Sequence, residues 1–226
     1  MTTRLILIRH GEAVCNVERT VQGVATCQGL SPLGHLQAAR LAERIAVEEW
    51  RADALFVSPI ARARQTGEPV AKALGLAMRF DPDVEEIRPG EAEGMTWDQF
   101  EAAFGQSEGW MPDVPFAPAA EPWTDFAKRV AGALDRFAAE FDQRMVVIVA
   151  HGGVVDASFY RFFAIDPLLT SPVDFRTDNA SITEWELRVF NDDLRRWRLV
   201  RYNDTAHLRD SHAAPADVKA GTSARA

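Results

Sequence analysis

The sequence predicts an α/β fold, a three-layer sandwich in which helices flank a mostly parallel central sheet. Short apolar runs alternate along the chain with longer segments of helical periodicity, and this alternation is typical of sheets built from βαβ units. Three of the apolar runs end abruptly at polar residues. Because the carboxyl ends of parallel strands meet at one edge of a sheet, where ligands bind, these polar residues are expected to form a site there.

In the first half of the chain, the pattern predicts two buried strands, each followed by a helix. Residues 5–8 are wholly apolar, Leu-Ile-Leu-Ile, as expected for a strand buried on both faces. A helix is expected from Pro32, with Ser31 as its N-cap. Residues 54–57 form the second apolar run, which stops at a Ser-Pro turn, and residues 60–74 then have helical periodicity.

In the second half, the pattern predicts a further helix and strand and a closing hairpin. Apolar side chains recur at steps of four, four, three and four, which predicts a strongly amphipathic helix through Phe126, Val130, Leu134, Phe137 and Phe141. The apolar strand 145–150 follows, and residues 154–163 are again helical in pattern. Alternation over 183–189 and 197–199, around a turn at 191–193, predicts a hairpin that closes the sheet.

Length and composition fit one domain with an insertion. The 226 residues, 47% of them hydrophobic, are enough to bury a full core. We expect a domain over residues 1–208 with a cap insertion at about 91–125, where Pro, Gly, Trp and Phe interrupt the rhythm around one weak helix at 96–104. Residues 209–226 are small and polar, and we expect them to be a disordered tail.

Composition also limits the partners and the location. The net charge of −8 and the lack of any Lys/Arg-rich run argue against a nucleic-acid partner. Cys15 and Cys27 cannot form a disulfide framework and are expected to be structural or incidental thiols. The four apolar residues before Arg9 are too few for a signal peptide, and no later stretch could span a membrane. We therefore expect a cytoplasmic protein without a membrane partner, either a monomer or a homodimer.

Four polar segments hold residues that could act on a phosphate ester. Arg9 and His10 follow the first strand, Arg62 lies in SPIARARQT, Glu86 in DVEEIRPGEAEG and His151 in AHGG. Arginines donate bidentate hydrogen bonds to phosphate oxygens, and such cations stabilise a phosphoryl group in transfer. A histidine can attack phosphorus through one ring nitrogen if the other is held as a donor, which forms a covalent intermediate. His10, at the end of a rigid strand, suits that role.

The alcohol that leaves a phosphate ester needs a proton, so the site requires a carboxylic acid near the cations. Glu86 is the expected acid, with Glu85 and Glu93 as alternatives. Arg64 is likewise an alternative to Arg62, because the two arginines lie in the same segment.

These segments resemble those of a known family. LIRHGEAVCN, SPIARARQT, VEEIRPGEAEG and VAHGGV are similar, in order and spacing, to the four signature segments of the phosphoglycerate mutase-like histidine phosphatases. The similarity continues to NDTAHL near the C-terminus and covers nearly the whole chain except the cap and the tail. It implies the fold of that family and a phosphatase activity that needs no metal and no other cofactor.

The resemblance also implies a role for each candidate residue. His10 would accept the phosphoryl group, and Glu86 would donate the proton. The phosphate pocket would be formed by Arg9, Arg62 and His151. The substrate side would be lined by Asn16, Gln22, Gly23 and Gly152.

The composition of the cap indicates which ester is bound. Between Arg88 and Lys128 there is no Lys or Arg, but there are seven aromatic residues: Trp97, Phe100, Phe104, Trp110, Phe116, Trp123 and Phe126. A mutase must hold the carboxylate and the second phosphate of phosphoglycerate, which requires nearby cations, unless Arg19 or Arg176 reaches the pocket from outside the cap. We therefore expect a phosphomonoester hydrolase whose partner is a small-molecule phosphate ester, either apolar or weakly charged.

Three other functions are alternatives to a phosphomonoester hydrolase. A phosphoglycerate mutase shares the histidine chemistry and is the closest alternative. A catalytically silent relative that binds phosphorylated ligands is disfavoured by the intact set of site residues. A metallohydrolase built on His10 and His151 is disfavoured because the sequence has no HExxH or comparable spacing. Of the remaining histidines, His35 is not expected to take part, and His207 is a candidate for the pocket mouth.

Overall fold

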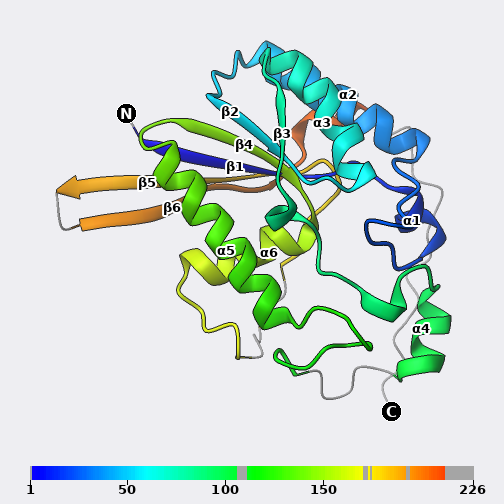
Figure 1. Cartoon of the computed structure of the whole chain (residues 1–226). Helices are drawn as coiled ribbons and strands as arrows, with labels where there is room; N and C mark the ends of the chain where they lie inside the picture. The colour runs from blue at the N-terminus through cyan, green and yellow to red at the C-terminus, as the bar shows by residue number, and fades with distance from the viewer. Residues whose placement is uncertain (1, 106–110, 170–172, 174, 192–193, 212–226) are drawn as a thin grey trace.

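The computed structural model describes residues 2–105, 111–169, 173, 175–191 and 194–211, and it confirms the predicted α/β sandwich (Figure 1). Its sheet has six strands in the order β3-β2-β4-β1-β5-β6. The strands are β1 Thr3–Arg9, β2 Ala54–Val57, β3 Met78–Phe80, β4 Met145–Ala150, β5 Ile182–Asn191 and β6 Leu194–Asp204. The pairs β1–β4, β4–β2 and β2–β3 are parallel, whereas β5 is antiparallel to β1 and forms the predicted hairpin with β6.

Helices cover both faces of the sheet (Figure 1). The helices are α1 Val14–Glu18, α2 Pro32–Val47, α3 Ala61–Leu74, α4 Trp97–Phe104, α5 Trp123–Glu140 and α6 Gly152–Phe162. Short 3-10 helices occur at Pro82–Val84, Gly90–Ala92 and Ala206–Ser211. In the described part of the chain, no helix is both long and apolar enough to cross a membrane.

The apolar run of β1 serves both faces, which explains why it does not alternate with polar residues. Leu5 and Leu7 belong to one core with side chains of α5 and α6. Ile6 and Ile8 belong to a second core with side chains of α2 and α3. The middle of a strand between two helical layers has no solvent face, so every position of the run 5–8 is apolar.

Local signals set the ends of the helices. Ser31 caps α2 as predicted, with its side chain accepting a hydrogen bond from the backbone N–H of Gly34. Thr96 and Gln99 form a capping box at the start of α4, each side chain bonded to the other residue's backbone N–H. In Figure 1, α1 and α4 lie beyond the edge of the sheet where β1 and β4 end.

The structure differs from the sequence-based expectation in several places. Strand β3 and helix α1 were not predicted, because three and five residues are too few to show a period. Helix α6 begins at Gly152 rather than 154, since two glycines read as a loop. The expected tail begins too early at 209, because the last 3-10 helix reaches Ser211. Residues 212–226, Trp110 and the turn residues 192 and 193 lie outside the described residues.

Candidate active site

Three parallel strands end side by side at the site. Backbone hydrogen bonds continue past the strand ends: the His10 N–H donates to the carbonyl of Ala150 at 2.9 Å, and the Ser58 N–H donates to that of Val149 at 3.0 Å. His10, Ser58 and the residue after β4, His151, are therefore brought together by the register of the sheet. The prediction that the strand-end residues meet at one edge is confirmed.

The loop after β1 is clamped between α2 and α3. The N–H of Gly11 donates to Oγ1 of Thr66 on α3 at 3.0 Å. A β-carbon on Gly34, in the first turn of α2, would lie 1.9 Å from the carbonyl oxygen of Glu12. The helix can approach the loop this closely only because Gly34 has no side chain. His10 therefore stands on a rigid support.

A cavity of about 530 Å³ opens at this edge. Of the predicted site residues, it is lined by Arg9, His10, Asn16, Gln22, Arg62, Glu86 and Gly152. Its apolar wall consists of Val21, Ile87, Pro89, Trp97, Phe100 and Phe116. Gly23 is not part of the lining and packs against Glu93 instead. His151 is not part of it either and lies fully buried against His10, with 5.3 Å between the ring centroids.

The hydrogen bonds of His10 define its tautomer. Nε of Arg62 lies 3.1 Å from Nε2 of His10, and because a guanidinium only donates, Nε2 accepts. Nδ1 therefore carries the proton and donates to the carbonyl of Gly11 at 2.7 Å. The ring presents the lone pair of Nε2 toward Arg62.

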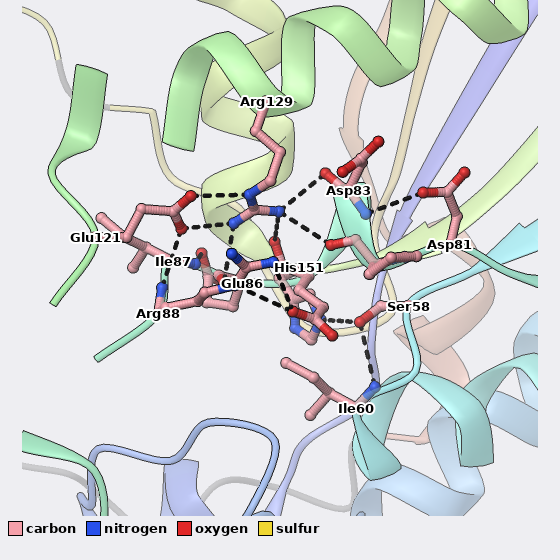
Figure 2. Close-up of polar contacts among 12 residues, drawn as sticks. Ser58, Ile60, Asp81, Asp83, Glu86, Ile87, Arg88, Glu121, Arg129 and His151 are labelled. Carbon is pink, nitrogen blue, oxygen red and sulfur yellow. Dashed lines mark hydrogen bonds and ion pairs between the residues drawn. The ribbon is translucent and has the colours of Figure 1, made fainter. Parts of the chain in front are cut away.

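Both site histidines are held neutral. Burial is the main cause that lowers the pKa of His10 well below its ordinary value of 6.5, and the charges of Arg62 and Arg9 lower it further. Burial is also the main cause that lowers the pKa of His151 well below 6.5, followed by the charge of Arg62. Nε2 of His151 lies 2.8 Å from Oγ of Ser58, a contact visible in Figure 2.

The two arginines beside His10 form no ion pair with a described residue, although the charges of Glu86, Asp156 and Asp178 act on Arg9 from a greater distance. Among the described residues, neither Arg9 nor Arg62 has a carboxylate within ion-pair distance. Arg9 donates to the carbonyl of Thr177, and Nη1 of Arg62 donates to that of Gln22 at 3.2 Å. Arg64 is exposed and does not line the cavity. The geometry thus favours Arg62 over Arg64 and leaves two cations available for an anion.

The three candidate acids have different surroundings. Glu86 lines the cavity and accepts the N–H of Gly153 at 3.2 Å and that of Ile87 at 2.9 Å. Glu85 pairs with Arg88 at 3.4 Å and lies outside the lining. The position of Glu86 also depends on Gly153, where a β-carbon would lie 2.2 Å from the carboxylate.

Glu93 binds the loop at residues 25–26 and does not line the cavity. Its Oε1 accepts the N–H groups of Ala25 and Thr26, at 2.9 and 3.0 Å, and so holds that loop in place. Glu86 is therefore the acid that the geometry favours.

The remaining predicted residues support the site from its sides. Oδ1 of Asn16 accepts the N–H of Ala13 at 2.9 Å and lies 3.4 Å from Nδ2 of Asn179, which in turn donates to the carbonyl of His10. Gln22 contributes its carbonyl to Arg62. Gly152 lies next to Arg9 in the lining.

Comparison with known proteins agrees with this geometry. Residues 5–205 match the model of the histidine phosphatase superfamily, branch 1. The chain belongs to this superfamily. It is 31% identical to a glucosyl-3-phosphoglycerate phosphatase of Mycobacterium tuberculosis, over 91% of this chain and 96% of the relative. It is 30% identical to the uncharacterized phosphatase PhoE of Bacillus subtilis, over 91% and 97%.

A solved structure extends the comparison. The phosphoserine phosphatase of Entamoeba histolytica, a mutant in complex with phosphoserine, superposes with a TM-score of 0.72 at 26% identity, over 91% of this histidine phosphatase and 99% of that chain. The family and the phosphatase names of these relatives identify the protein as a phosphomonoesterase and disfavour the mutase alternative.

Sequence reasoning missed several residues of this histidine phosphatase. Cys15 lines the cavity, and Sγ of Cys27 lies 3.5 Å from Nη1 of Arg62, although both were expected to be structural or incidental thiols without a place in the site. Of the two cations outside the cap that the sequence analysis named, Arg19 lines the cavity, whereas Arg176 lies in a separate one. Arg129, which donates hydrogen bonds to the backbone carbonyls of Glu85 and Glu86, was also missed.

The other two histidines weighed above, His35 and His207, lie outside the cavity lining. His35 is exposed on α2, and His207 lies 3.4 Å from Arg44 of that helix rather than in the lining. Among the described residues, no group of three or more His, Cys, Asp or Glu side chains could hold a metal ion.

The lowered pKa values give a pH prediction for this histidine phosphatase. In the free enzyme, the rings of His10 and His151 should keep the NMR shifts of neutral imidazole as the pH falls through 6.5. Since the unfolded chain takes up these protons at about pH 6.5, the stability from the neutral rings is fully present above that pH and falls below it. A ring of either residue that titrates at its ordinary value would contradict this.

Proposed function

We propose that the protein hydrolyses a small phosphate monoester through a phosphohistidine on Nε2 of His10. The observation that carries the proposal is two guanidinium groups without an ion pair among the described residues, Arg9 and Arg62, in the same cavity as a neutral histidine with an anchored Nδ1 proton. A phosphate dianion supplies the missing negative charge. Its oxygens take over the donors of Arg62, which frees the lone pair of Nε2 to attack phosphorus.

The first step breaks the bond between phosphorus and the ester oxygen. Nε2 of His10 forms a bond to phosphorus, and Glu86, in its protonated form, gives its proton to the departing oxygen. The alcohol leaves, and the phosphoryl group stays on the histidine. In the second step Glu86 takes a proton from water as the water oxygen forms a bond to phosphorus. The bond from phosphorus to Nε2 breaks, inorganic phosphate is released, and His10 and protonated Glu86 are restored.

The ester is proposed to be apolar or weakly charged. The wall away from His10 includes Ile87, Trp97, Phe100 and Phe116, which favours an apolar or aromatic leaving group. With Arg9 and Arg62 assigned to the phosphate, Arg19 is the one remaining cation in the lining formed by the described residues. A leaving group with several negative charges would find too few donors.

The phosphohistidine is tested by rapid-quench mass spectrometry during turnover. We expect acid-labile phosphate on His10, and a loss of activity on the order of a thousandfold or more in His10→Ala. His35→Ala is the matched control, because His35 is exposed on α2 and outside the lining. A wild-type enzyme that turns over without any phosphoenzyme would refute the mechanism.

The acid role is tested by changing the leaving group. In Glu86→Gln, kcat/KM for an alkyl ester such as glycerol phosphate should fall much further than for p-nitrophenyl phosphate, because p-nitrophenolate leaves almost without a proton. We expect kcat/KM for p-nitrophenyl phosphate divided by kcat/KM for glycerol phosphate to rise about tenfold or more. Glu85→Gln serves as control, and a change there in place of Glu86→Gln would move the acid role to Glu85.

The substrate class is tested with phenyl phosphate and 3-phosphoglycerate. We expect kcat/KM to be about tenfold or more higher for phenyl phosphate, and interconversion of 3- and 2-phosphoglycerate to be negligible in a coupled assay. Trp97→Ala should reduce the preference, whereas Phe190→Ala, an exposed aromatic on β5, should not. Efficient interconversion of the phosphoglycerates would restore the mutase alternative.

A further inference from the structure

Arg129 of α5 is a charged side chain that the proposed chemistry does not use, although it is largely buried. Its side chain is 11% exposed, as is that of its partner Glu121. Figure 2 shows the guanidinium between Glu121 and the segment that carries Glu86. Burying a charged pair of this kind stabilises a fold little by itself, so its position calls for an explanation.

Every nitrogen of the guanidinium is engaged. Nε and Nη2 donate to the two carboxylate oxygens of Glu121, at 2.8 and 2.6 Å. Nη1 donates to the carbonyls of Pro82, Asp83 and Glu85, at 3.2, 3.0 and 3.2 Å. Nη2 also reaches the carbonyl of Glu86 at 3.5 Å. One side chain thus binds the backbone on both sides of the α-carbon of Glu86.

The partner of Arg129 reaches the same segment from its other end. Oε2 of Glu121 accepts the backbone N–H of Arg88 at 3.2 Å. Arg129 and Glu121 together therefore bracket the backbone from residue 82 to residue 88, with Glu86 between their contacts (Figure 2).

Glu86 needs such a brace because its own segment has no regular structure. Residues 85–89 belong to no helix or strand. The carboxylate itself has only two hydrogen-bond partners among the described residues, the N–H groups of Ile87 and Gly153. A general acid that is displaced by about 1 Å can lose about a hundredfold in rate. The place of the carboxylate is therefore decided by what holds the backbone.

We propose that Arg129 is a positioning residue, which, with Glu121, holds Glu86 at the distance from the ester oxygen that proton transfer requires. The inference rests on the proposed role of Glu86 as general acid. It assigns no contact between Arg129 and the substrate, since Arg129 does not line the cavity.

Helix α5 offers a matched control, Arg136. It lies on the same helix, its guanidinium is 5.0 Å from the ring centroid of Phe137, and that of Arg129 is 5.2 Å from the ring centroid of Phe126. Arg136 also binds the segment before Glu86, but through the side chains of Asp81 and Asp83, at 2.9 and 3.0 Å. It makes no hydrogen bond to the carbonyls of Glu85 or Glu86 among the described contacts.

The test measures kcat/KM for p-nitrophenyl phosphate and for glycerol phosphate in Arg129→Lys and in Arg136→Gln. Lysine keeps the charge but cannot bind the carboxylate and the carbonyls at once. The ratio compared is kcat/KM for p-nitrophenyl phosphate divided by kcat/KM for glycerol phosphate. We expect this ratio to rise about tenfold in Arg129→Lys, where kcat/KM for p-nitrophenyl phosphate itself falls less than about threefold. In Arg136→Gln the ratio should stay within about twofold of that of the wild type. The ratio does not depend on the fraction of folded enzyme, because both substrates are measured on one preparation.

Two further variants keep the test decisive. Glu121→Asp withdraws the partner carboxylate while keeping its charge, and it should also raise the ratio. It takes the place of Arg129→Lys if that variant does not yield folded enzyme. The double variant Arg129→Lys with Glu86→Gln should show the ratio of Glu86→Gln alone, because an absent acid cannot be misplaced.

The outcomes separate this inference from the proposed function. An unchanged ratio in Arg129→Lys, beside a raised ratio in Glu86→Gln, would overturn the inference alone. An equal rise in Arg136→Gln would also overturn it, since it would show that any loosening of the segment has the same effect. An unchanged ratio in Glu86→Gln itself would overturn the acid role, and the positioning role with it.

Discussion

Positive charge that no ion pair neutralises among the described residues is the constraint on which this site depends. Arg62 is 4% exposed, and neither it nor Arg9 has a described carboxylate within ion-pair distance. Keeping such charges unpaired costs free energy of folding, which an anion in the cavity offsets. His10 is neutral chiefly because it is buried, and the two guanidinium groups act in the same direction, because a proton on Nε2 would add a third positive charge beside them. In the proposed function, a phosphate group supplies the negative charge that these guanidinium groups do not meet in an ion pair.

The sheet accounts for the part of the site that could be predicted from the sequence. Arg9, His10 and His151 follow directly on apolar runs, and the parallel pairing of β1 and β4 brings them together. A residue that ends a buried strand is fixed by local sequence and by the topology alone, so pattern reasoning finds it. Arg62 was harder, because Arg64 has the same charge two positions away, and only the helical turn of α3 puts one into the cavity and the other into solvent.

Residues whose position depends on contacts far along the chain could not be predicted in this way. Glu86 was the expected acid, but the pattern alone could not exclude Glu93, because the choice depends on which backbone N–H groups each carboxylate meets, those of α6 or those of the loop at 25–26. Arg129 lies more than forty positions from the carbonyls of Pro82, Asp83 and Glu85, and its place in the pattern of α5 is that of an ordinary polar residue. The short elements β3 and α1 were not predicted for a different reason. Each has fewer residues than two periods of its strand or helix pattern, so no hydrophobic periodicity can be recognised.

The two halves of the site are thus held by different means, and this has a consequence for how it can change. The proposed phosphate end stands on strand ends and on the clamp between α2 and α3, where there is no room for a side chain at Gly34. The proposed acid, Glu86, and the apolar wall stand on segments held by side chains, such as Arg129 with Glu121 and the ring of Phe100 against Phe116. A substitution in the second group can alter the fit of the leaving group or the place of the acid without moving His10. Substrate preference can therefore differ between chains that share the same phosphate chemistry, because only the rigid half must stay the same.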